Sequence, residues 1–257
     1  MTKRRKFLVS AVLLTLGFVV FNFLGNQQRL IGISILSILA VISSVWSLYE
    51  GLGLDMTLTT LILPAFFTFG AGIFWFLLPS NILVRMPIFI IYGIGIYVLS
   101  LTSNIYTVSA IRTIALLRAA RGVGFVLTLL TYFLIYDAIY SLRAPIYVSV
   151  PAVLLTSFPL FFQGYWSASL DTILSKDVLR LSIIASVIMT ETAVCLYFWP
   201  ATVVVGSLFL TVSAYVLLGL GQAKIETRLF SQTVKEYLIL GVLVFVGMFF
   251  ATHWGGV

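Results

Sequence analysis

The chain has 257 residues, of which 61% are apolar and 9% are charged, and its formal net charge is +7. Soluble domains carry about 25% charged residues, so this composition excludes an ordinary water-exposed globular fold. The bilayer must therefore act as the solvent, and each spanning segment must satisfy its backbone hydrogen bonds as a helix or within a closed barrel.

The apolar runs are too long and too continuous for barrel strands. A spanning helix needs about 20 apolar residues, whereas a barrel strand needs about 10 that alternate with polar ones. We expect an all-α fold, a polytopic bundle that forms a single integral membrane domain over residues 1–257. The predicted spans, in chain order, are Phe7–Leu24, Leu30–Tyr49, Thr57–Leu78, Met86–Leu101, Val123–Leu142, Pro145–Phe162, Leu179–Trp199, Ala201–Leu220 and Tyr237–His253.

Proline positions bear on two of these spans. Pro200 directly follows Trp199, and a proline ends one helix and suits the first turn of the next, so we expect a tight helical hairpin there. Pro151 and Pro159 interrupt the sixth span. Without that span the C-terminus would lie on the opposite side of the membrane.

Positive charges between the spans fall on alternate sides. If the N-terminus is cytoplasmic, twelve of the 15 Lys and Arg residues lie on that side. These are Lys3, Arg4, Arg5, Lys6, Arg112, Arg118, Arg121, Lys176, Arg180, Lys224, Arg228 and Lys235, against Arg29, Arg85 and Arg143 outside. Cytoplasmic loops of membrane proteins carry such an excess. The pattern predicts an inner-membrane protein with its N-terminus inside and its C-terminus outside, although the loop Glu50–Asp55 has no cation.

The basic N-terminus also resembles the start of a secretory signal. However, the apolar run that follows is about 18 residues, longer than a signal core, so we expect an uncleaved anchor. The other basic residues are spread over membrane-proximal loops, which is typical of insertion and of contact with anionic lipid rather than nucleic acid. The single cysteine, Cys195, excludes an intramolecular disulfide.

Two segments on the cytoplasmic side have the pattern of short interfacial helices. In Ile105–Arg121 and in Gln222–Glu236, apolar residues alternate with cations at helical spacing. Basic amphipathic helices bind anionic membrane surfaces, although such segments also serve as plain connectors with snorkelling cations. The candidate contacts with anionic lipids are Arg112, Arg118, Arg121, Lys224 and Arg228.

Ionisable residues within the spans are the candidates for a functional site. Asp137 lies in the fifth predicted span and Glu191 in the seventh, both toward the outer side. Such groups usually face protein or water, because charge in hydrocarbon is costly. The candidate intramembrane polar site consists of Asp137, Glu191, Arg143, Arg85, Tyr132, Tyr136 and Tyr140. The same residues would also fit a purely structural role, as a salt bridge or as hydrogen bonds between helices.

Known catalytic patterns do not fit the sequence. The one histidine, His253, excludes metal motifs of the H-E-x-x-H kind, and we expect no metal and no cofactor. Tyr136-Asp137 and Gly219-Leu220-Gly221-Gln222 resemble the motifs of intramembrane aspartyl proteases. Those enzymes need two carboxylates that share a proton, and Gln222 stands where the second would be, so we reject this activity.

The C-terminal third carries another resemblance. The residues concerned are Trp199-Pro200, Tyr215-Val216-Leu217-Leu218-Gly219-Leu220, Arg228-Leu229-Phe230 and Val234-Lys235-Glu236-Tyr237-Leu238. This pattern resembles uncharacterised multi-pass integral membrane proteins of ultra-small candidate-phylum bacteria. The resemblance implies a bacterial inner membrane and supplies no activity.

Three classes of function remain open. The first is a non-enzymatic membrane component, either a scaffold or an accessory subunit, which fits the lack of catalytic motifs. The second is a small-molecule or lipid transporter that uses Asp137 and Glu191. The third is a membrane-embedded transferase that acts on a lipid-linked substrate, with one of these carboxylates as the base near Arg143. The sequence names no substrate, protein partner or oligomeric state.

Overall fold

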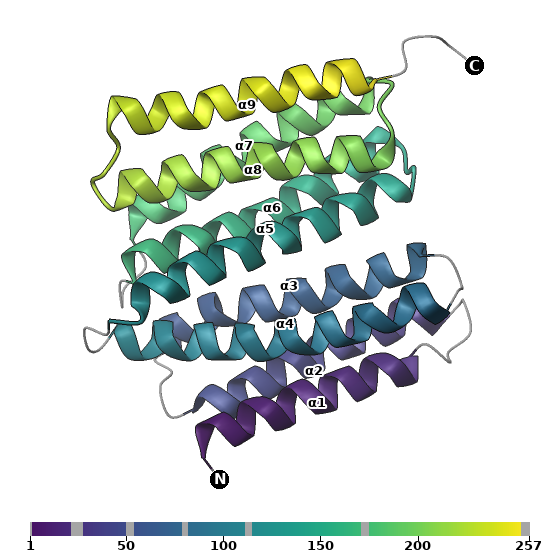
Figure 1. The fold of residues 1–257 in the computed structure, drawn as a ribbon, viewed down its shortest axis with the longest axis vertical. Coiled ribbons are helices and arrows are strands. Elements are labelled where there is room, and N and C mark those ends of the chain that lie inside the picture. Colours follow the sequence, from purple (N-terminus) through teal and green to yellow (C-terminus); the bar gives the residue numbers. More distant parts are fainter. Residues whose placement is uncertain are drawn as a thin grey trace. The chain divides into compact units, whose positions relative to one another are not determined.

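The computed structural model describes residues 2–21, 28–49, 54–78, 82–110, 115–170 and 175–252. All the regular secondary structure in these ranges is helical (Figure 1). The helices are α1 (Lys3–Phe21), α2 (Arg29–Leu48), α3 (Leu54–Leu77), α4 (Ile82–Ser109), α5 (Leu117–Ser141), α6 (Ile146–Ser169), α7 (Lys176–Tyr197), α8 (Val203–Ile225) and α9 (Ser231–Ala251).

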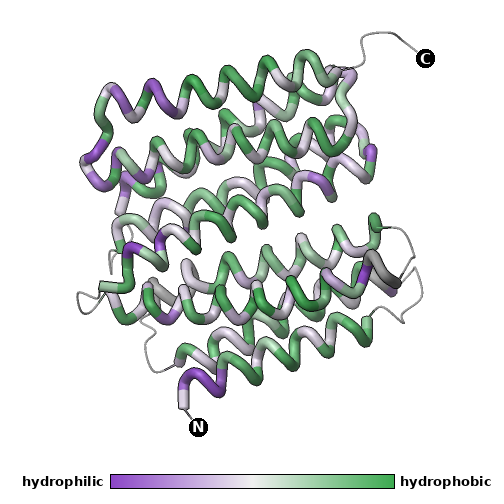
Figure 2. Tube along the Cα trace, viewed as in Figure 1, coloured by the Kyte–Doolittle hydropathy of each residue, from purple (hydrophilic) through white to green (hydrophobic). Residues whose placement is uncertain are grey.

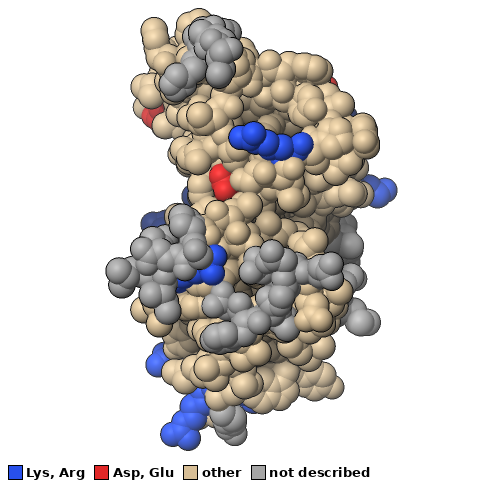
Figure 3. All heavy atoms as spheres, turned by 90° about the vertical axis from the view of Figure 1, so that its right-hand side faces the viewer, with Lys and Arg blue, Asp and Glu red and all other residues tan. Residues whose placement is uncertain are grey.

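Eight of these helices, α2 to α9, are long and apolar enough to cross a membrane. Any 18 consecutive residues of α1 include at least three of its four initial cations, Lys3 to Lys6, and α1 is not among the eight. The fold is thus a polytopic helical bundle of a multi-pass membrane protein, and the ninth span remains a prediction. The segment with Pro151 and Pro159 is one helix, α6, and its 24 residues are enough to span. Apolar residues predominate along the helices (Figure 2), and Lys, Arg, Asp and Glu side chains are visible on the side of the molecule where helices end (Figure 3).

The two expected interfacial helices are not seen as separate elements. The segment Ile105–Arg121 is shared between the end of α4 and the start of α5, with residues 111–114 outside the described ranges. Its Tyr106 is buried and donates a hydrogen bond to the carbonyl of Ala120 at 3.0 Å, so the end of α4 is bonded to the start of α5. The lipid contact expected of this segment stays a prediction. Likewise, Gln222 belongs to α8 and Glu236 to α9.

The helices group into two compact units, and the boundary falls inside α5, between Ile135 and Tyr136. In the first unit α1 packs on α2, α2 on α3, α3 on α4, and α4 back on α1. Aromatic rings fill the centre of this ring of helices. Phe18 stacks on Tyr92 with ring centroids 4.6 Å apart, and Tyr92 stacks on Phe67 at 5.9 Å. These rings are buried, so apolar packing organises the first unit.

The second unit contains the end of α5 and helices α6 to α9. Here α6 packs on α7 and α8, and α8 packs on α7 and α9. Small residues allow two of these contacts: Gly221 of α8 lies against the ring of Tyr165 of α6, and Gly219 lies against the ring of Tyr237 of α9. Small residues are common at membrane helix interfaces because they let neighbouring elements approach closely. The expectation of one domain over the whole chain stays a prediction.

Candidate functional site

The last turns of α5 form three polar contacts with other helices of the second unit. Tyr136 Oη lies 2.8 Å from Ser157 Oγ on α6. Ser207 Oγ on α8 donates to Asp137 Oδ1 at 3.3 Å, and Tyr140 Oη donates to the carbonyl of Ala193 on α7 at 3.3 Å. The end of α5 thus hydrogen-bonds to three different helices.

The spacing on α5 explains this arrangement. Residues at i and i+4 share a helix face, so Tyr136 and Tyr140 point in similar directions one turn apart. Asp137 is turned by about 100° from Tyr136 around the helix axis, because an α-helix has 3.6 residues per turn. It therefore reaches a different neighbour.

Asp137 lies in a closed environment. Asp137 is 6% exposed, and its hydrogen-bond partner is the hydroxyl of Ser207. That hydroxyl also lies 3.1 Å from the carbonyl of Val204, so its single proton has two acceptors within reach. No ion pair involving Asp137 occurs within the described ranges. The carboxyl group is therefore held by a hydroxyl and not by a cation.

Glu191 does not join this group of contacts. It lies on the exposed side of α7, whereas Ala193, two residues further, is buried. Two residues correspond to about 200° around a helix, so Glu191 points away from the side of α7 that meets Tyr140. The flanking threonines bond to their own helix, Thr190 to the carbonyl of Ser186 and Thr192 to that of Ile188.

Of the two arginines of the predicted site, Arg143 belongs to the second unit and Arg85 to the first. Arg143 follows α5 in a left-handed conformation with φ of 45° and is exposed, and in the described part of the chain it forms no ion pair with Asp137 or Glu191. Arg85 belongs to the first unit. Its guanidinium lies 5.1 Å from the ring centre of Trp75 and donates to the carbonyl of Leu78 at 3.1 Å, at the end of α3. Tyr132 is fully buried in the first unit.

Of the seven predicted site residues, the structure thus joins Tyr136, Asp137 and Tyr140 through one helix end. The partners Ser157, Ser207 and Ala193 were not predicted from the sequence. The two serines are hydroxyl residues within largely apolar helices, but neighbouring hydroxyls such as Thr156 and Thr211 give the same signal, so the sequence does not single them out. A backbone carbonyl such as that of Ala193 has no side-chain signal at all.

The residues that resembled a protease motif have structural roles. Gln222 Nε2 donates to the carbonyl of Gly164 at 2.9 Å, and Gly219 and Gly221 accommodate aromatic rings. Asp137 meets α8 at Ser207, and the fifteen residues from there to Gln222 correspond to about 22 Å of helix. The two positions are too far apart for a shared proton, which agrees with the rejection of this activity.

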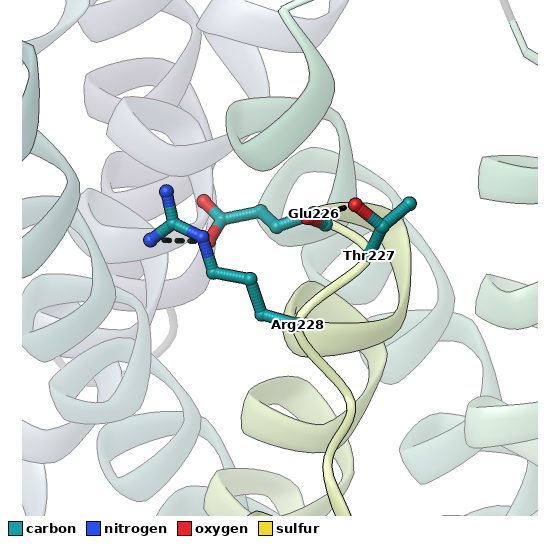
Figure 4. A network of polar contacts seen from close by, with 3 residues as sticks. All are labelled: Glu226, Thr227 and Arg228. Atoms are coloured by element: carbon teal, nitrogen blue, oxygen red, sulfur yellow. Dashed lines mark hydrogen bonds and ion pairs between the residues drawn. The ribbon is translucent and has the colours of Figure 1, made fainter.

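The predicted lipid-contacting cations lie near helix ends. Arg118 is exposed at the start of α5, and Lys224 is exposed at the end of α8. Arg228 is exposed in the connection from α8 to α9, with its guanidinium 3.6 Å from the carboxylate of Glu226 (Figure 4). Arg112 lies outside the described residues. Exposed ion pairs of this kind contribute little to stability. The expected contacts of these cations with anionic lipids stay a prediction.

In the parts of the chain that the structure describes, no three side chains of His, Cys, Asp and Glu gather into a metal-binding group. His253 lies beyond those parts. The exposed Cys195 is one turn after Glu191 on α7.

The fold and these contacts define a multi-pass helical membrane protein whose buried polar groups connect its helices. The chain belongs to an uncharacterised family, described as "Protein of unknown function (DUF5656)", whose sequence model matches residues 9–251. Searches among curated proteins and among solved structures found no match. The bacterial origin inferred from the C-terminal third stays a prediction.

Proposed function

We propose that this protein is a non-enzymatic component of a membrane assembly, a scaffold or accessory subunit. The observation that carries the proposal is that the buried candidate residues form hydrogen bonds between helices. Asp137, Tyr136 and Tyr140 are engaged in hydrogen bonds to three neighbouring helices. Glu191 and Arg143 lie on exposed positions away from these bonds, so these candidate residues do not bring an acid, a base and a cation to one place where a substrate could react.

A test of this function measures proton movement, because an ionisable intramembrane residue is the usual carrier in a transporter. The purified protein is reconstituted into liposomes that contain a pH-sensitive dye, and a pH gradient is applied. We expect the same rate of dye response as in protein-free liposomes. A faster response that disappears in Asp137→Asn or Glu191→Gln would overturn the proposal and favour a transporter.

A transporter is the second candidate, and one contact favours it. Asp137 is buried in a span with a hydroxyl as its partner and with no cation paired to it in the described residues. Such a carboxyl group is a plausible binding site for a proton or a small cation. The transferase has weaker support, because Arg143 is not paired with either carboxylate that would act as the base.

For the location we propose the cytoplasmic (inner) membrane, with the N-terminus inside and the C-terminus outside. Within the second unit, Arg143 lies in the connection from α5 to α6, whereas Lys176, Lys224, Arg228 and Lys235 lie at the opposite helix ends. Reporter fusions at Val257 test the orientation. We expect activity from a reporter that works only outside the cytoplasm; activity of a cytoplasm-specific reporter would reverse the C-terminal side.

For the partners we propose anionic lipids at the cationic helix ends, in addition to protein. Binding of the detergent-solubilised protein to vesicles with and without phosphatidylglycerol would measure the preference. A double variant, Lys224→Gln with Arg228→Gln, should lose part of it, since each cation near an anionic surface adds favourable electrostatic energy. Equal binding of the variant and the parent protein would contradict these contacts.

A further inference from the structure

A groove on the surface of the first unit runs between α1 and α4, which pack side by side (Figure 1). Five residues of α1 between Leu8 and Leu16 line it, together with Gly93, Ile94 and Tyr97 of α4. The volume of the groove is about 320 Å³. An apolar cavity of about 150 Å³ is large enough to bind benzene, so this groove has room for a longer apolar group.

The lining of the groove suits hydrocarbon. It is almost entirely apolar, and small residues form part of it. Gly93 lies against Thr15, where a Cβ atom would come within 2.7 Å of the threonine hydroxyl oxygen, so α1 and α4 touch here. That hydroxyl donates to the carbonyl of Ala11 on its own helix at 2.7 Å. The groove therefore offers little to a polar ligand.

The depth of the groove corresponds to the interior of a bilayer. Gly93 and Tyr97 lie near the middle of Arg85–Ser109, which is long and apolar enough to cross a membrane. On α1, the lining from Leu8 to Leu16 covers about 12 Å of helix. One leaflet contributes about 15 Å, half of the hydrocarbon core. The groove thus has nearly the depth of one leaflet, and the hydrocarbon available there is that of a lipid.

Two cations stand at one end of the groove. Arg4 and Arg5 precede Leu8 by four and three residues, so they share its face of α1, and both are exposed. Lys6, in contrast, is turned toward α2, where its amino group lies 5.9 Å from the ring centre of Trp46. Positive charge therefore adjoins an apolar groove at the level where headgroups meet hydrocarbon.

We propose that this groove binds one anionic phospholipid, with an acyl chain between α1 and α4 and with the phosphate at Arg4 and Arg5. A guanidinium group matches a phosphate in shape and forms bidentate hydrogen bonds with it. The net negative charge of the headgroup complements the two cations. A helix of another protein is a poorer occupant. With its side chains it is about 10–12 Å across, so it could place only single side chains in a hollow of about 320 Å³.

This site is distinct from the cationic helix ends proposed above as lipid contacts. Lys224 and Arg228 belong to the second unit, whereas α1 and α4 belong to the first. At those ends only charge would attract a lipid, whereas the groove also contacts its chain. The site goes beyond the proposed function, because a lipid held there is compatible with a scaffold and with a transporter alike.

The first experiment tests the headgroup. Native mass spectrometry of the detergent-solubilised full chain counts bound lipids while phosphatidylglycerol is added in limiting amounts. We expect Arg4→Gln with Arg5→Gln to weaken binding of the first lipid about 30-fold, the equivalent of about 1 kcal/mol for each cation near an anionic headgroup. Lys3→Gln with Lys6→Gln removes the same charge from the same turn of α1 and should change binding little. Phosphatidylcholine with the same chains should bind the parent protein more weakly than phosphatidylglycerol does.

The second experiment locates the chain. Phosphatidylglycerol with a photoactivatable diazirine on one acyl chain is added in an equimolar amount, the sample is irradiated, and the labelled residues are identified by peptide mapping. We expect adducts between Leu8 and Leu16 on α1 and near Ile94 on α4. The reference is α9, which is exposed to lipid at residues such as Phe250 and should carry few adducts.

A bulky residue in the groove should displace the lipid. Val12 lines the groove and is 49% exposed, and we expect Val12→Trp to weaken binding about tenfold, which corresponds to the burial of about two methylene groups. Leu13 is 61% exposed and does not line the groove, so Leu13→Trp is the matched control. Thermal unfolding in detergent shows whether each variant folds. Ile94→Trp blocks the groove from α4 and replaces Val12→Trp if that variant does not fold.

Equal losses in the arginine and the lysine variants would overturn the site, because the attraction would then be unspecific. Labelling of α9 as strong as that of α1 would do the same, since it indicates only lipid around the whole protein. Loss of a protein complex in Val12→Trp with unchanged lipid binding would assign the groove to another helix and refute the lipid. The variant Lys224→Gln with Arg228→Gln should leave the labelling of α1 unchanged, so failure of those contacts and failure of this site are distinguishable.

Discussion

The ring of Tyr165 on α6 lies so close to Gly221 on α8 that a methyl group on this glycine would overlap the ring. The hydroxyl of Tyr165 donates to the carbonyl of Leu217 at 3.0 Å, one turn earlier on α8. Next to this contact, Gln222 donates to the carbonyl of Gly164. The α6–α8 interface therefore combines a small residue, an aromatic ring and two hydrogen bonds to backbone carbonyls, and its geometry leaves no room for a larger residue.

Replacement of this glycine should therefore destabilise the second unit. We expect Gly221→Ala to lower the free energy of unfolding by about 1–3 kcal/mol, the usual effect of overpacking a tight interface. Gly206→Ala is the matched control on the same helix, because a Cβ atom there would meet no atom within 4 Å. The control should be neutral or stabilising by up to about 1 kcal/mol. Titration with dodecyl sulfate in mixed micelles measures both variants, and equal effects would contradict the contact.

At the end of α8, by contrast, we expect a substitution to raise the stability of the protein. Thr227 follows the helix with a φ of 58°, and the bonds from Thr227 N to Lys224 O and from Arg228 N to Ala223 O form a Schellman motif. Glycine adopts this conformation without cost, whereas a β-branched residue is strained there. We expect Thr227→Gly to stabilise the protein by about 1 kcal/mol. Thr227→Ala keeps the Cβ atom and should gain less, so an equal gain from both would refute the strain.

The fold was predictable from the sequence to the extent that hydrophobicity determines it. Long apolar runs predict helices because, apart from a closed barrel, only a helix satisfies all its backbone hydrogen bonds in lipid. Each predicted span overlaps one helix of the structure. The ends were predicted less well. Helices α4 and α8 continue beyond their apolar runs, since Tyr106 and Gln222 find partners on neighbouring helices. Such tertiary contacts leave no periodic signal.

The candidate site illustrates the same limit. Ionisable residues within spans were easy to find in the sequence. Whether each one is buried or exposed depends on which side of its helix packs against neighbouring helices. Asp137 turns out to face Ser207, while Glu191 lies on the exposed side of α7. The pairing of Arg85 with a carboxylate was expected from its side of the membrane alone. Its contact with the ring of Trp75 lies within the first unit, and charge counting does not describe such a contact.

The contact of Arg85 leads to a test of that expected pairing. Arg85→Ala should destabilise the first unit by about 1–2 kcal/mol, since it removes a cation–π contact and a charged donor to the end of α3. If Arg85 acts only there, its effect should add to that of Asp137→Asn within about 0.5 kcal/mol. A larger coupling energy in the double variant would restore the pairing of these two residues. The measurement is the same unfolding titration on all four proteins.

Variants of the hydrogen-bonded residues Asp137 and Ser207 distinguish a structural role of the Asp137 carboxyl group from a functional one. If the carboxyl group only connects α5 to α8, Asp137→Asn should cost little, because an amide can still bond to the serine hydroxyl. Asp137→Leu should cost about 1 kcal/mol, the net contribution of one hydrogen bond, because the Ser207 hydroxyl keeps the carbonyl of Val204 as its acceptor. Ser207→Ala added to Asp137→Leu should then cost less than Ser207→Ala in the parent protein, because the bond between the two side chains is already absent. If instead Asp137→Asn unfolds normally but abolishes a cellular phenotype that Ser207→Ala preserves, the carboxyl group acts as an acid or an ion ligand, and the transporter becomes the better description of this protein.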